Sequence, residues 1–231
     1  AEDLELFEHL GERTLNLMLY ARSEDVFERD PDLFRAHRER QERLRSLQEV
    51  YRLRLAHLKR AARELLAREG DAELLEPERE SAIDALRELD AHHLVRIRAV
   101  NQRFEAAWRP LSRSAVARHV AQIERTLAGA QALAIAGGHV AILLNRLRLF
   151  GIDRLLGDRR VFAWSAGAMA VSERVVLFHD SPPQGQGNAE VLEAGLGWAA
   201  GVVPLPHARR RLALDNRLRV ALFARRFSPA L

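Results

Sequence analysis

Ser165 stands where a short apolar stretch gives way to a run of small residues. Residues 161–164, Val-Phe-Ala-Trp, predict a strand, and residues 166–170, Ala-Gly-Ala-Met-Ala, predict a helix packed closely against it. A serine at such a strand-to-helix turn is a candidate nucleophile, because the turn lifts its hydroxyl above the sheet edge. The backbone N–H of Ala166 would then face a developing oxyanion. The same letters also suit an ordinary helix start with Ser165 as the N-cap, so this segment alone leaves both interpretations open.

Other residues that could complete such chemistry follow further apolar runs. Gly137-Gly138, Asp180 and His207 each stand at the end of a predicted strand. An acyl-transfer site needs a base for the serine, a carboxylate that orients the imidazole, and N–H groups for the oxyanion. The chain order is Ser165, Asp180, His207. Any long chain contains these residue types, so their shared position at strand ends is what favours a catalytic set.

The elements that must position these residues lie in the C-terminal part of the chain. Short apolar runs alternate there with helical segments, which predicts an α/β region with a small parallel sheet. The carboxyl ends of parallel strands meet at one edge of the sheet and gather functional residues. The predicted strands are 132–136, 161–164, 174–178 and 202–205.

The first 128 residues predict helices and no strand. Asp30-Pro31 predicts a helix start, and apolar residues then recur three or four apart through Leu65. Gly70-Asp71 predicts the end of that helix, and Glu76-Pro77 predicts the start of the next, which continues to Trp108. Two long striped helices joined by a short turn form an antiparallel hairpin. With a third helix over 114–127, they predict an all-α region, 1–128, before the α/β domain, 129–231.

Composition limits the classes of function. The 231 residues include no cysteine, which excludes disulfides, thiolate metal sites and a cysteine nucleophile. Neither a signal peptide nor a membrane span is evident, so we expect a cytoplasmic protein without a membrane partner. The adjacent His92-His93 pair points in two directions on a helix and predicts no metal site. The arginines of 209–226 alternate with leucine and valine, which favours a packed amphipathic helix over a nucleic-acid interface.

Together these motifs resemble a known family of serine peptidases. Gly137-Gly138, the 163–168 segment Ala-Trp-Ser-Ala-Gly-Ala and Pro206-His207 are similar to aspartyl dipeptidases (peptidase E) and cyanophycinases. The resemblance implies a fold similar to class I glutamine amidotransferases, here small and incomplete because only four strands are predicted. It also implies a Ser165 nucleophile, a His207 base, Asp180 as the third triad member, and oxyanion donors at Gly138 and Ala166.

The sequence therefore predicts a serine hydrolase that cleaves peptide or isopeptide bonds next to acidic residues. Arg209, Arg210 and Arg211 follow His207 after a single alanine, and arginine pairs bidentately with carboxylates, so they are candidate substrate-binding residues. The mechanism requires no cofactor. The alternative is a catalytically inactive relative that acts as a helical assembly protein. In either case the apolar stripes of 33–108 predict a homo-oligomer, most simply a two-fold dimer.

Overall fold

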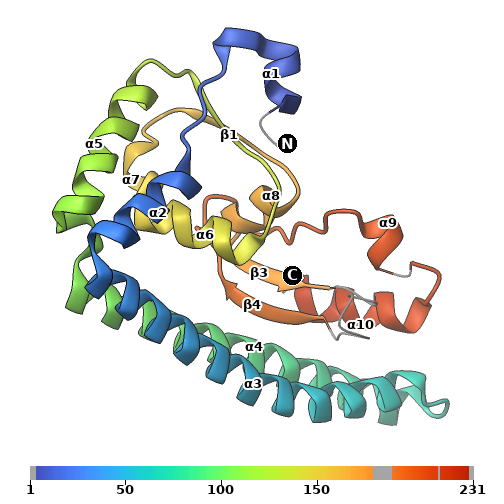
Figure 1. Cartoon of the computed structure of the whole chain (residues 1–231). Helices are drawn as coiled ribbons and strands as arrows, with labels where there is room; N and C mark the ends of the chain where they lie inside the picture. The colour runs from blue at the N-terminus through green and yellow to red at the C-terminus, as the bar shows by residue number, and fades with distance from the viewer. Residues whose placement is uncertain (1–3, 179–188, 213, 229–231) are drawn as a thin grey trace. The chain divides into compact units, whose positions relative to one another are not determined.

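The computed structural model describes residues 4–178, 189–212 and 214–228 (Figure 1). Its regular structure before residue 129 is helical, as the sequence predicts. These helical elements are α1 (Leu4–Leu10), η1 (Gly11–Arg13), α2 (Leu19–Arg29), α3 (Pro31–Ala67), α4 (Ala72–Trp108), η2 (Pro110–Ser112) and α5 (Ser114–Ala128). Figure 1 shows α3 and α4 side by side as the predicted hairpin.

Local capping sets where the two long helices begin. Asp30 caps α3 as predicted, and its carboxylate accepts a hydrogen bond from the Leu33 N–H at 3.1 Å. The predicted start of α4 at Glu76-Pro77 is wrong, because the helix begins earlier. The Asp71 carboxylate accepts from the Glu73 N–H at 3.0 Å and caps the helix there. The proline therefore lies inside α4.

All strands of the described residues follow residue 128. β1 (Ala132–Ile135) pairs in parallel with β2 (Arg160–Ala163), and β3 (Arg174–Leu177) pairs antiparallel with β4 (Glu190–Ala194). The helices of this part are α6 (Val140–Leu149), α7 (Ile152–Leu155), α8 (Ala166–Val171), α9 (Ala208–Arg211) and α10 (Arg217–Phe227). A long helical region thus precedes a region with small sheets, as predicted.

The expected single parallel sheet is wrong beyond its first pair of strands. Residues 202–205 form no strand, because Pro204 and Pro206 lack the N–H that a ladder requires. β4, which the sequence did not predict, pairs with β3 instead. The two glutamates of β4 interrupt the run of apolar residues by which a buried strand is predicted from sequence. Both are bound by distant side chains: Arg52 donates to Glu190 at 2.7 Å through Nε and Nη2, and Asn101 donates to Glu193 at 2.9 Å.

The chain forms two compact units, and each contains helices from the N-terminal half and one of the sheets. Unit 1 comprises residues 1–39 and 103–170, and unit 2 comprises residues 40–102 and 171–231. The boundaries between the units fall inside α3, α4 and α8. The predicted boundary at residue 128 therefore separates an all-helical stretch of sequence from the stretch that contains the strands. It does not separate the two compact units, because each unit packs helices from the first stretch against a sheet from the second.

An apolar cluster and a buried ion pair hold unit 2 together. The cluster includes Tyr51, Leu86, Val191 and Phe227, which come from α3, α4, β4 and α10. The helix α10 occupies the arginine-rich segment and buries Leu222 and Phe227, so the prediction of a packed amphipathic helix is confirmed. No helix among the described residues is long and apolar enough to cross a bilayer.

The ion pair joins α4 to α10. Asp90 and Arg226 have side chains only 2% exposed, and the guanidinium donates to the carboxylate at 2.7 Å (Nε–Oδ2) and 2.6 Å (Nη2–Oδ1). The Tyr51 hydroxyl donates to Asp90 at 2.8 Å and accepts from the Val191 N–H at 3.0 Å. Arg226 Nη2 also donates to that hydroxyl at 2.8 Å. We call these residues the Asp90–Arg226–Tyr51 network.

Candidate active site

Ser165 lies at a sharp turn between β2 and α8. Its φ of +53° is in the left-handed region, which non-glycine residues rarely adopt. An ordinary N-cap serine has an extended backbone instead, so the geometry favours the strained turn expected of a nucleophile. The turn is fixed on both sides: the Trp164 N–H donates to the Ile135 carbonyl at 3.1 Å, and the Gly167 N–H donates to the Trp164 carbonyl at 2.9 Å.

Two glycines allow backbone to approach this turn. A Cβ on Gly137 would lie 2.9 Å from Ser165 Oγ, so the loop after β1 directly faces the hydroxyl. A Cβ on Gly167 would overlap the carbonyl oxygen of Ile135, so only glycine lets α8 pack on β1 at this point. The glycine loop and the serine, 28 residues apart along the chain, are therefore neighbours in unit 1.

The two predicted oxyanion donors directly follow Gly137 and Ser165 in the chain. Gly138 follows Gly137 and has a φ of +115°, a conformation that glycine tolerates. Ala166 is the first residue of α8, and the N–H groups of a first helical turn have no acceptor within the helix. Both amides thus belong to the backbone that surrounds Ser165.

The other predicted site residues lie outside unit 1 or outside the described residues. His207 is exposed, has a φ of +60° and precedes α9 in unit 2. Arg209 and Arg211 are exposed on α9, which also contains Arg210, whose side chain is not among those described. Asp180 lies outside the described residues. The pairing of Ser165 with His207 and Asp180 stays a prediction.

Unit 1 contains a second imidazole–carboxylate pair that sequence reasoning missed. His119 Nε2 and Asp25 Oδ2 are 2.7 Å apart, and hydrogen bonds from Arg29 and His119 lower the pKa of Asp25 to about 2. The other ring nitrogen, Nδ1, lies 3.0 Å from Arg22 Nη1. Because both ring nitrogens are engaged and the residue is 7% exposed, His119 holds α5 against α2 and has no nitrogen left to accept a proton from a serine.

One histidine of the adjacent pair on α4 has a structural role as well. His93 is buried, stacks on Tyr51 at 4.1 Å between ring centroids, and lies 2.8 Å from Gln48 Oε1. Burial lowers its pKa to about 4. Within the described ranges, no group of three or more His, Cys, Asp or Glu residues could hold a metal ion.

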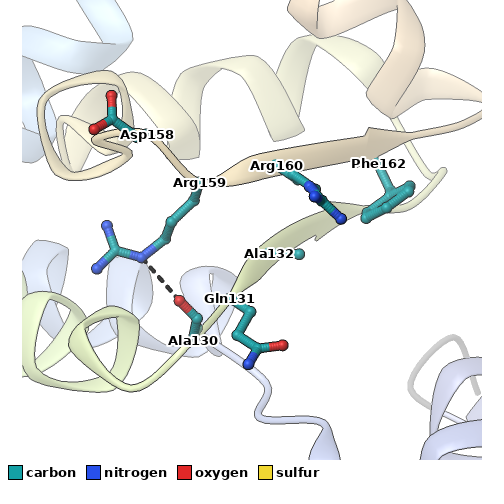
Figure 2. Close-up of a pocket in the computed structure, with 7 residues that line it drawn as sticks. All are labelled: Ala130, Gln131, Ala132, Asp158, Arg159, Arg160 and Phe162. Carbon is teal, nitrogen blue, oxygen red and sulfur yellow. Dashed lines mark hydrogen bonds between the residues drawn. The ribbon is translucent and has the colours of Figure 1, made fainter.

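A hollow lies on unit 1, at the start of the β1–β2 sheet rather than at Ser165. It measures about 730 Å³ and is lined by Gln131, Ala132, Arg160 and Phe162 together with neighbouring residues (Figure 2). Ser165 follows the other ends of the same strands. The hollow is therefore separate from the candidate nucleophile.

Comparisons with protein families, with curated proteins and with solved structures find no match for this chain. The resemblance to aspartyl dipeptidases and cyanophycinases thus rests on the residues named above, and it stays a prediction.

Proposed function

We propose that the chain is a serine hydrolase that cleaves peptide or isopeptide bonds next to acidic residues. The observation that carries the proposal is the left-handed backbone of Ser165 between β2 and α8, with Gly137 so close to its hydroxyl that a Cβ there would lie 2.9 Å from Oγ. Strain of this kind persists where the surrounding structure enforces it, and it concentrates at functional sites. The proposal includes that residues 129–231 form a domain similar to peptidase E, with a small version of the amidotransferase-like fold.

In this mechanism Ser165 Oγ bonds to the scissile carbonyl carbon while His207 takes the hydroxyl proton. Asp180 orients the imidazole, and the amides of Gly138 and Ala166 hold the negative oxygen. The C–N bond then breaks, and His207 returns the proton to the leaving amine. Water, deprotonated by the same imidazole, hydrolyses the acyl ester and regenerates the serine.

The arginines after His207 supply the proposed preference for acidic substrates. Arg209 and Arg211 present exposed guanidinium groups on one turn of helix. A guanidinium pairs with a carboxylate through two parallel hydrogen bonds. An aspartyl side chain or a free α-carboxylate next to the scissile bond fits this chemistry, and Arg210 is the third candidate for such a contact.

Covalent labelling tests the nucleophile directly. We expect a fluorophosphonate probe to form one adduct, located at Ser165 by peptide mass spectrometry. Ser165→Ala should abolish the adduct and reduce hydrolysis of aspartyl dipeptides by about 10⁴-fold or more. Ser46→Ala, at an exposed serine of α3, is the matched control and should change neither. An unlabelled wild-type protein that also hydrolyses no acidic peptide would contradict the proposal.

The second candidate is the inactive assembly protein, and the surface of the hairpin favours it. Val50 and Leu53 on α3 are 61% and 65% exposed, and Val95 on α4 is 60% exposed. Val50 and Leu53 lie one helical turn apart, and neighbouring exposed apolar side chains are typical of surfaces that bind other chains. An unlabelled protein whose assembly is lost in Leu53→Ser would support this second function.

A further inference from the structure

One face of the β1–β2 sheet is uncovered. Along β1, Leu133 and Ile135 are buried, whereas Ala132 and Ala134 are exposed. Along β2, Arg160 and Phe162 are exposed, and the Phe162 side chain is 58% accessible. Trp164 continues the same alternation beyond the end of the strand and is 36% exposed. Because parallel sheets are normally covered on both faces, this apolar face indicates a binding surface.

The hollow described above is part of this uncovered face. Figure 2 shows the Arg160 guanidinium and the Phe162 ring side by side, with Gln131 and Ala132 of the neighbouring segment on the same side. Arg159 donates to the carbonyls of residues 127, 130, 155 and 156, so its charge is held at the rim. Among the described residues, no carboxylate forms an ion pair with Arg160. Asp158 also lines the hollow, so the face combines an aromatic surface with two arginines and one carboxylate.

The N-terminal arm, residues 4–18, carries exposed apolar side chains and negative charge, which complement the exposed face of the sheet. Phe7 and Leu10 are one helical turn apart on α1 and are 52% and 40% exposed, and Leu15 is 68% exposed. Residues 4–18 contain three glutamates, Glu5, Glu8 and Glu12, and one arginine, Arg13. The arm is therefore an acidic segment with an apolar face, and the sheet presents an apolar face with basic residues.

The arm does not cover the sheet of its own chain. Phe7 and Phe162 are each more than half exposed in the same structure, although both belong to unit 1. We propose that the uncovered β1–β2 face binds the N-terminal arm of a second copy of this chain. Two copies exchange their arms around a two-fold axis, so that each contributes the same pair of surfaces. The apolar contact supplies the affinity, and the charges select the partner.

Light scattering tests both surfaces, because it measures the molecular mass of the wild type and of single-substitution variants. We expect the wild type to be a dimer at about 10 µM. Phe162→Ser should raise the dissociation constant of the dimer about tenfold or more, because aromatic residues at the centre of an interface contribute most of its affinity. Arg160→Glu and Glu8→Arg should each weaken the dimer, and the double variant should recover it. Val202→Ser, at another apolar side chain that is 51% exposed, is the control and should leave the dimer intact.

The absence of cysteine allows a direct test of which copy supplies the arm. We expect Glu8→Cys and Gln131→Cys chains, mixed and mildly oxidised, to form a disulfide-linked heterodimer at least tenfold faster than Glu8→Cys mixed with Val202→Cys. Both variants in one chain should yield linked dimers.

Four results would overturn the proposal. They are a wild-type monomer at about 100 µM, equal cross-linking rates for the two mixtures, closure of the double-cysteine chain within a monomer, and a dimer that Leu53→Ser dissociates while Phe162→Ser does not. The last result would assign the dimer to the α3–α4 hairpin.

Discussion

Asp90→Asn removes the negative charge from the buried Asp90–Arg226–Tyr51 network and leaves the positive charge in place. Both side chains of the pair are 2% exposed, so water cannot replace the lost carboxylate. The asparagine amide group would also direct N–H groups at Arg226 Nε or at the Tyr51 hydroxyl, where the carboxylate now accepts three hydrogen bonds. The variant therefore combines an unpaired buried cation with mismatched donors.

The expected loss of stability follows from that burial. Removal of one partner of a buried ion pair destabilises a protein by about 3–5 kcal/mol, a large part of the typical free energy of unfolding of about 5–15 kcal/mol. Tyr51→Phe leaves the pair intact but removes one hydroxyl, so we expect a smaller loss of about 1–3 kcal/mol. Asp90→Leu combined with Arg226→Met should be more stable than Asp90→Leu alone, because no unpaired charge remains.

Urea unfolding followed by far-ultraviolet circular dichroism measures these differences as shifts of the midpoint at a constant slope. The matched control is Asp84→Asn, the same change on the same helix. The Asp84 side chain is 54% exposed and pairs with Arg87 at 2.8 Å, so its loss should change stability by less than about 1 kcal/mol. If Asp90→Asn shifts the midpoint no further than this control does, the inference of a tightly packed, water-free network is wrong.

Three further predictions concern the candidate site and a buried amine. Gly137→Ala should strongly reduce phosphonate labelling, because the new methyl group would lie 2.9 Å from Ser165 Oγ. The control is Gly129→Ala, which should leave labelling unchanged because the nearest atom to its new Cβ would be 4.0 Å away. Arg211→Ala should raise KM for acidic peptides about 5- to 20-fold at unchanged kcat, whereas Arg98→Ala, at an exposed arginine of α4, should leave both constants alone. Burial and nearby arginines lower the pKa of Lys59 to about 7. The NMR resonance of its Nζ, the only lysine nitrogen of the chain, should therefore titrate near pH 7. A midpoint near pH 10.5 would show that this amine is not buried as described. The unfolded chain keeps that proton up to about pH 10.5, so stability should rise with pH between about 7 and 10.5, and Lys59→Met should remove the rise.

The elements that the sequence predicted correctly depend on local signals. The cap at Asp30 and the apolar stripe of α3 lie within a few residues of each other, and helical periodicity repeats them over many turns. The turn at Ser165 is also local, because the strand, the serine and the small residues of α8 are consecutive. Its contact with Gly137 could be predicted because parallel strands end at the same edge of a sheet.

The elements that the sequence did not predict depend on partners far along the chain. β4 contains Glu190, whose partner Arg52 lies 138 residues earlier, so no window of sequence shows that this carboxylate can be buried in a strand. Asp90 and Arg226 are 136 residues apart and look like two ordinary surface charges on striped helices. The strand predicted over 202–205 was a misjudgement of local signals, since Pro204 inside it and Pro206 just after it are visible in the sequence.

The boundaries between the two compact units have a consequence for how this protein could have arisen. Each boundary falls inside a helix, within α3, α4 and α8, rather than in a loop. A single break in the gene at any of these points would cut a helix and divide at least one of the two cores, because each unit is built from two separate stretches of chain. Neither unit can therefore be gained, lost or transferred by one recombination event. The two units are expected to be inherited together, and a fragment beginning at residue 129 would lack the helices that each core requires.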